Sequence, residues 1–167
     1  MHFKRITFIL CAGILSLIPA SGQLAVNDGR TSEKSSLSVE REKVVNTAMK
    51  YIGVRYRTGA SGPKYFDCSG FTSFVYRQKN VKLTRTSRSQ YAEGKPVAKI
   101  EDLKPGDLVF FGGSQSTRTV GHVGIVKEVD PQSGDFSFVH ASRTGVKVSQ
   151  LSSSYYKKRY IGARRVF

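Results

Sequence analysis

The pattern of apolar and polar positions is helical in the first half of the chain and strand-like in the second half. Between residues 38 and 53, apolar side chains recur at intervals of three and four, which is typical of one face of a helix. Ser38 can cap this helix, and Gly53 can end it. Its apolar face consists of Val45, Ala48, Met49 and Ile52.

A second helix is predicted to begin just after Asp67, whose carboxylate can accept hydrogen bonds from the free N–H groups of the first turn. This helix stops near Asn80, and a short third helix is predicted over residues 87–94. The apolar side of the second helix carries Phe71, Phe74 and Val75.

After residue 103, short apolar runs alternate with turn sequences such as "KPGD" and "DPQSGD". These runs predict strands over residues 108–111, 122–129, 136–142, 146–151 and 160–167. Helices followed by an antiparallel sheet predict an α+β domain. The glycines of "FGGSQS" lack the spacing and the lysine of a phosphate-binding loop, so they predict a connection between two strands.

The start of the chain has the pattern of a secretory signal peptide. A short basic opening precedes the apolar run Ile6 to Ile18, and small residues follow. This run suits a signal-peptide core of roughly 7–15 residues better than a membrane span of about 20. We predict a signal peptide at 1–22, a flexible Ser- and Gly-rich linker at 23–37 and one domain at 38–167, exported to the periplasm, the cell envelope or the outside. An uncleaved anchor and a buried first strand are the alternatives.

The formal net charge is +15, and only Lys4 and Arg5 of the Lys and Arg residues fall within the predicted signal peptide. An exported cationic domain is attracted to polyanions, for which an anionic cell wall or membrane surface is a better candidate than nucleic acid. A largely scattered distribution of charge is equally typical of a solvated surface. Arg85 and Arg88 suit either a groove for acidic substrates or that surface. Nothing in the sequence indicates a dimer interface, and a monomer is expected.

Cys68 becomes the only cysteine once the predicted signal peptide, which contains Cys11, is removed. One cysteine cannot form an internal disulfide, and a structural zinc site needs several Cys or His ligands at short spacing. Reactivity is the simplest reason for a free thiol in an oxidising compartment; a buried apolar role and a disulfide between chains are the alternatives. A helix N-terminus at Cys68 would lower the pKa of the thiol and supply N–H groups to an oxyanion.

Two histidines can serve this thiol, His122 in "GHVGIV" and His140 in "FVHAS". They lie on consecutive predicted strands joined by the turn "DPQSGD". If these strands pair antiparallel, the start of one lies beside the end of the other, and the two imidazoles become neighbours. One histidine could then take the thiol proton while the other orients it. A structural role is the alternative for each.

Five segments resemble the NlpC/P60 family of cell-wall cysteine peptidases, over the chain from about Val44 to the C-terminus. They are "DCSGF" at 67–71, "RTSRSQ" at 85–90, "LKPGDLVFF" at 103–111, "GHVGI" at 121–125 and "HAS" at 140–142. The resemblance implies a papain-like α+β fold. It also implies a Cys-His-His triad with Cys68 as nucleophile, His122 as general base and His140 as orienting residue.

The resemblance further matches Tyr56 to a tyrosine beside the oxyanion site, and Asp67 and Ser69 to positions that shape substrate binding. The implied reaction is amide hydrolysis in peptidoglycan stem peptides through a thioester, without a metal or cofactor. The bond is D-Glu–diaminopimelate or D-Ala–diaminopimelate. "RYRTGA" at 55–60 and Tyr65 depart from the family pattern near the substrate groove, which leaves that bond open. The alternatives are an amidase or transpeptidase with the same triad and an inactive wall-binding protein.

Overall fold

The computed structural model describes residues 29–167, and in this range the main helices precede a single six-stranded sheet. The helices are α1 (Gly29–Met49), α2 (Cys68–Arg77), α3 (Ser87–Gln90) and α4 (Ser154–Lys157), with a 3-10 turn at Ile100–Asp102. The strands are β1 (Lys95–Val97), β2 (Leu108–Gly112), β3 (Val120–Asp130), β4 (Asp135–Ser142), β5 (Gly145–Gln150) and β6 (Tyr160–Arg165). The predicted α+β class is confirmed. The predicted signal peptide and the first part of the predicted linker lie outside the described residues.

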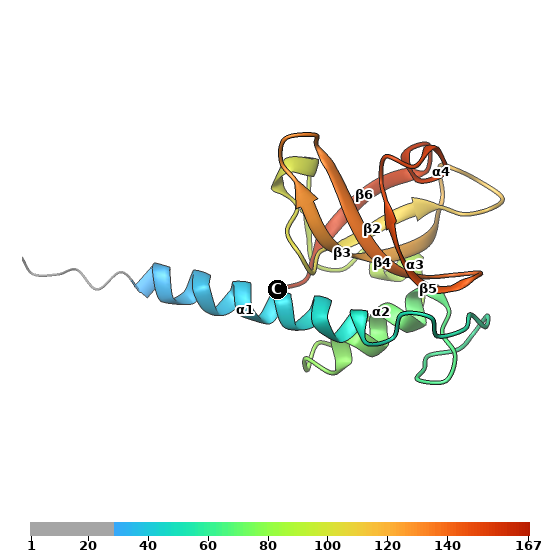
Figure 1. Cartoon of the computed structure of the whole chain (residues 1–167), viewed down its shortest axis with the longest axis horizontal. Coiled ribbons are helices and arrows are strands. Elements are labelled where there is room, and N and C mark those ends of the chain that lie inside the picture. The colour runs from blue at the N-terminus through green and yellow to red at the C-terminus, as the bar shows by residue number, and fades with distance from the viewer. Residues whose placement is uncertain (1–28) are drawn as a thin grey trace, which may run out of the picture.

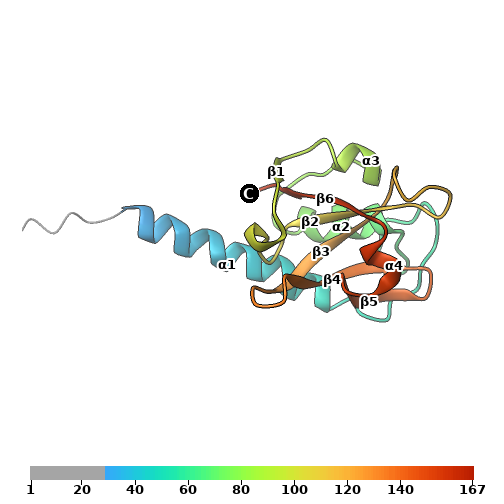
Figure 2. The same ribbon diagram turned by 90° about the horizontal axis from the view of Figure 1, so that it is seen from above.

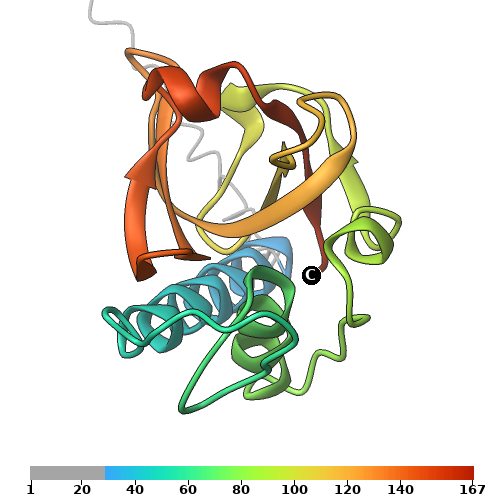
Figure 3. The ribbon, with the colours of Figure 1, turned by 90° about the vertical axis from the view of Figure 1, so that its right-hand side faces the viewer.

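The sheet has the strand order β1-β6-β2-β3-β4-β5, and every neighbouring pair is antiparallel. Figure 1 shows α1 and α2 below this sheet. In the end-on view of Figure 3, the sheet curls strongly, and the two helices lie side by side beneath its convex face. The five strands predicted from the sequence correspond to β2 to β6 and are confirmed. The sequence did not predict β1 or α4, which have too few residues to form a recognisable pattern.

Both faces of the sheet are packed with apolar side chains, and β2 is buried along its whole length. Successive side chains of a strand point to opposite faces. Leu108 and Phe110 accordingly pack against the helices, while Val109 and Phe111 pack inside the curl of the sheet. This two-sided burial is the reason that "LVFF" is a continuous apolar run instead of an alternating one.

The helix α1 corrects the predicted linker, because it begins at Gly29 and residues 29–37 are helical. Ser38 lies inside this helix and its hydroxyl donates to the backbone oxygen of Ser35, so Ser38 is not a cap. All side chains from residue 33 to residue 39 are exposed, and this part of α1 extends away from the sheet (Figure 2). A helix that buries no face has no apolar periodicity by which the sequence could reveal it.

The other end of α1 also differs from the prediction. The helix ends at Met49, and Ile52, which was predicted on the apolar face, is exposed. Val44 is fully buried instead. Gly53 adopts a positive φ of 86° in the turn that follows the helix, a conformation that glycine tolerates best. None of the described helices is long and apolar enough to cross a membrane.

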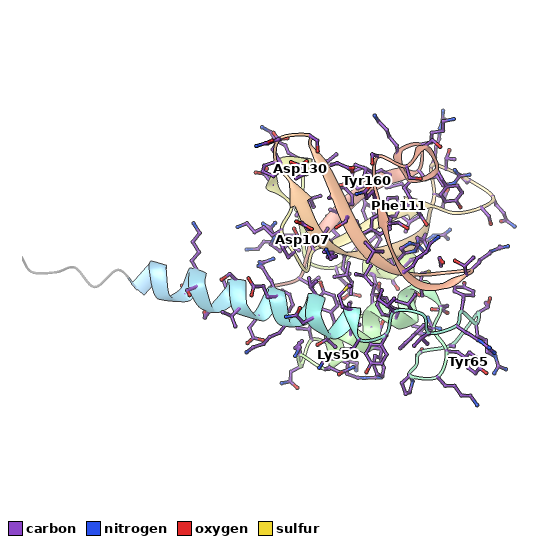
Figure 4. All side chains as sticks on the ribbon, in the orientation of Figure 1. Lys50, Tyr65, Asp107, Phe111, Asp130 and Tyr160 are labelled. Carbon is purple, nitrogen blue, oxygen red and sulfur yellow. The ribbon has the colours of Figure 1, made fainter. Side chains whose placement is uncertain are left out.

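A buried carboxylate ties α1 to the sheet. Asp107, from the predicted turn "KPGD", is fully buried and accepts a hydrogen bond from Arg41 of α1 at 3.3 Å. It also accepts two from Arg165 of β6, at 2.8 and 2.7 Å. Figure 4 labels Asp107 between the sheet and α1. Two guanidinium groups thus compensate one carboxylate at the helix–sheet interface, which such a buried charge requires.

Candidate active site

Cys68 is the first residue of α2, as the sequence predicts. Asp67 caps the helix, and its Oδ1 accepts the N–H of Gly70 at 2.7 Å. The preceding loop lies directly against this turn, since a Cβ on Gly70 would overlap the backbone oxygen of Ala60. The cap and the loop together set the position of the thiol at the N-terminal end of α2.

Asp67 and Ser69 are held by Arg85 rather than directed into open space. The Arg85 guanidinium donates to both carboxylate oxygens of Asp67, at 3.0 and 2.6 Å, and to the Ser69 hydroxyl at 3.1 Å. The N–H of Gly59 donates to the same carboxylate at 2.9 Å. From the sequence, Arg85 suited either a groove for acidic substrates or a solvated surface. In the structure it is the ion-pair partner of Asp67 and orders the turn before Cys68.

The histidines His122 on β3 and His140 on β4 contact each other, as expected for an antiparallel pair. The Nε2 atom of His122 lies 2.8 Å from the Nδ1 atom of His140. The two residues are diagonal neighbours in the ladder rather than directly opposite, because the register pairs Ile125 with Val139. Gly124 leaves room for this arrangement: a Cβ there would lie 2.7 Å from the Phe138 ring and 3.2 Å from the Cβ of His140.

The far nitrogen of His140 has partners of its own, which the sequence did not reveal. Its Nε2 lies 2.9 Å from the hydroxyl of Ser149 on β5 and 3.3 Å from the phenol of Tyr156 on α4. These contacts hold the His140 ring, which in turn occupies Nε2 of His122. Among the described residues, Nδ1 of His122 has no hydrogen-bond partner, so this atom is free to act in the cavity described next.

One cavity of about 560 Å³ brings the predicted site residues together. Tyr56, Cys68 and His122 all line it, and His140 lies behind His122. Asp67 and Ser69 are buried beneath it and are not part of the lining. The other lining residues are Phe111, Gly112, Gly113, Ser114, Gly121, Ala141, Ser142, Arg143, Thr144, Lys147, Ser153, Tyr155 and Tyr156.

The electrostatics of this cavity correct the predicted low pKa of the thiol. Burial, and after it the Asp67 carboxylate, raise the pKa of Cys68, while nearby backbone N–H groups act in the opposite direction. Burial lowers the pKa of His122 to about 4. Burial also lowers the pKa of His140, as do the charges of His122 and Lys147. The resting site at neutral pH therefore holds a thiol beside a neutral imidazole, not a thiolate–imidazolium pair.

Because the pKa of Cys68 is raised, we predict that labelling of the thiol in the absence of substrate begins only at high pH. We expect iodoacetamide to alkylate Cys68 with a pH midpoint above that of a free cysteine, because the thiolate is the reactive form. Asp67→Asn keeps a capping side chain but removes the carboxylate charge, and it should move the midpoint down. Labelling rates followed by mass spectrometry from pH 6 to 10 would test this; a wild-type midpoint below that of free cysteine would contradict it.

The model of the NlpC/P60 family matches residues 53–165, and the chain belongs to this family. It is 35% identical over 153 residues to the murein DD-endopeptidase MepH of Escherichia coli (strain K12), an alignment covering 88% of this chain and 52% of MepH. It is 40% identical over 125 residues to a gamma-DL-glutamyl hydrolase of Bacillus subtilis (strain 168), covering 73% of this chain and 28% of that protein.

A solved structure of an NlpC/P60 family protein from Bacillus cereus ATCC 10987 matches with a TM-score of 0.66 and 31% identity, over 75% of this chain and 40% of that one. This agreement confirms the family and the papain-like α+β fold that the resemblance implied. The chain spans about half or less of the length of each of these three proteins.

Proposed function

We propose that the protein is an exported cysteine peptidase that hydrolyses amide bonds in peptidoglycan stem peptides. The observation that carries this proposal is one cavity lined by Cys68 and His122, with His140 hydrogen-bonded behind His122. The names of the relatives, a murein endopeptidase and a gamma-DL-glutamyl hydrolase, support an amide substrate of this class.

In the proposed reaction, His122 takes the Cys68 proton as the sulfur attacks the substrate carbonyl carbon. The tetrahedral intermediate collapses when the C–N bond breaks and His122 returns the proton to the leaving amine, which leaves a thioester on Cys68. Water, deprotonated by His122, then attacks the thioester and releases the free acid and the thiol. His140 keeps the His122 ring in the orientation that both proton transfers need.

The developing oxyanion needs hydrogen-bond donors near the sulfur. The N-terminal end of α2 supplies backbone N–H groups, and Tyr56 adds a phenol at the wall of the cavity. Burial, followed by the negative charge that Cys68 carries as a thiolate, raises the pKa of Tyr56, so the phenol keeps its proton and acts as a donor. Asp67 and Ser69 support this region from below through Arg85. No step in this mechanism requires a metal or a cofactor.

The location and the substrate bond belong to the same proposal. The apolar segment near the start of the chain supports export to the periplasm or cell envelope, and the cationic domain suits an anionic wall. A monomer is sufficient, because the residues of the proposed triad come from one chain. The bond is D-Glu–diaminopimelate or D-Ala–diaminopimelate; one relative is named as a murein DD-endopeptidase and the other as a gamma-DL-glutamyl hydrolase, so their names do not decide between the two bonds.

Digestion of purified peptidoglycan, with products identified by mass spectrometry, tests the proposal. The full chain should release new stem-peptide fragments whose masses name the bond, and Cys68→Ala should release none. Glycan strands released free of their stem peptides would indicate an amidase. Stem peptides joined to new partners would indicate a transpeptidase. Binding to the wall without any product would indicate an inactive wall-binding protein.

The contacts of His140 lead to a prediction for Ser149. Removing its hydroxyl by Ser149→Ala leaves Nε2 of His140 with the longer Tyr156 contact alone, so the His140 ring, and through it the His122 ring, is less well oriented. We expect kcat to fall about fivefold, the effect of one hydrogen bond, with KM unchanged. Steady-state kinetics would test this, with Ser152→Ala, an exposed serine, as the control. An effect on KM alone would contradict a positioning role.

A further inference from the structure

The charged side chains that line the cavity containing Cys68 are all basic. Arg143 and Lys147 line it, and none of its lining residues is an Asp or Glu. Both basic side chains are exposed, so a ligand in the cavity can reach them. The positive charge therefore lies in the wall of the cavity that contains the thiol, in addition to the scattered charges elsewhere on the surface.

One hairpin brings both cations to this wall. Arg143 lies in the turn between β4 and β5, and Lys147 lies on β5 directly opposite His140 in the register. The turn is ordered by Ser142, whose hydroxyl donates to the backbone oxygen of Gly145 at 2.8 Å and accepts the N–H of Thr144 at 3.2 Å. The same hairpin thus carries the orienting histidine and projects two cations beside it.

Neither cation has an acidic partner. Within residues 29–167, Arg41, Arg85 and Arg165 each pair with a carboxylate, whereas no ion pair involves Arg143 or Lys147. Their fields nevertheless reach the site: Arg143 counteracts the raised pKa of Tyr56, and Lys147 contributes to the lowered pKa of His140. Two unpaired cations at the wall of a cavity without carboxylates leave a place for a negative charge of the ligand.

We propose that Arg143 and Lys147 form a subsite for a carboxylate of the substrate, on a residue next to the scissile amide. This subsite deepens the proposed function and rests on it. A guanidinium offers donors in a planar fork that matches a carboxylate, and a lysine ammonium adds a point charge. Tyr155, Tyr156, Gly112 and Gly113 line the same cavity. The enzyme consequently distinguishes stem peptides with free carboxylates from those in which the carboxylates are amidated.

The test separates binding from hydrolysis. Cross-linked muropeptides, native or with their carboxylates converted to carboxamides, would be titrated calorimetrically into the full chain carrying Cys68→Ala, which holds the substrate intact. We expect the native form to bind about tenfold more tightly, as for one charge-assisted hydrogen-bonded pair. Adding Arg143→Gln and Lys147→Gln should reduce this preference to less than about twofold.

The matched control is Lys95→Gln with Lys99→Gln, which also removes two positive charges, from exposed residues on and just after β1, the opposite edge strand of the sheet. It should keep the full preference for the native muropeptides. Equal binding of the two forms, no binding of either, or a preference that survives in the Arg143→Gln, Lys147→Gln protein would overturn the subsite. If the preference behaves as expected but the wild type hydrolyses neither form, the subsite stands and the proposed peptidase activity fails.

Discussion

Replacing His122 by alanine is expected to lower kcat about 10³-fold, the largest effect on activity that we expect from a single histidine. The burial that raises the pKa of Cys68 leaves the thiol protonated at neutral pH. Attack on the substrate therefore needs a base within the cavity, and the free Nδ1 of His122 is the atom available for that role. Steady-state kinetics on muropeptides would measure the loss.

Two further measurements make this result specific. Denaturant unfolding should show that His122→Ala remains folded, since the side chain is only partly buried. Added imidazole should restore part of the activity, because it can enter the space left by the ring and accept the thiol proton. A variant that keeps more than a tenth of the wild-type kcat would contradict the assignment of His122 as the base.

Replacing Asp107 by alanine is expected to lower the free energy of unfolding by about 3–5 kcal/mol, the typical cost of removing one partner from a buried ion pair. Asp107 is fully buried and accepts hydrogen bonds from Arg41 and Arg165. Its removal leaves the guanidinium groups of Arg41 and Arg165 without a carboxylate partner. Urea unfolding followed by circular dichroism would measure the change.

Glu101→Ala provides the comparison for this result. Glu101 also pairs with a basic residue, Lys99, but both side chains are exposed and the pair is 3.6 Å long. Removing it should change the free energy of unfolding by less than about 1 kcal/mol. If the two variants were equally stable, the ion pairs of Asp107 with Arg41 and Arg165 would not be what joins α1 to the sheet.

The parts of the fold that the sequence predicted are those with a strong local signal. The structure has Asp67 as the cap of α2 and Cys68 as its first residue. The sequence predicts this start, because it shows both the capping carboxylate and the apolar helix face that follows. The hairpin that brings His122 to His140 follows from two apolar runs around the turn "DPQSGD". These local signals are enough to predict that Cys68, His122 and His140 lie close together.

The remaining features leave no local pattern in the sequence. Residues 33–39 of α1 are exposed and so show no apolar periodicity. Arg85 reaches Asp67, and Ser149 reaches His140, only after the chain has folded. The raised pKa of Cys68 has the same origin, since a helix N-terminus predicts a lower pKa but burial and Asp67 outweigh it.

The most direct test of the account is to capture the acyl-enzyme. Wild-type protein mixed with muropeptides and quenched in acid within milliseconds to seconds should show, by intact mass spectrometry, an adduct with the mass of the acyl half of the substrate. Peptide mapping should place this adduct on Cys68, and Cys68→Ala should show neither the adduct nor turnover. Hydrolysis that continues in Cys68→Ala would contradict the account, because another group would then be the nucleophile.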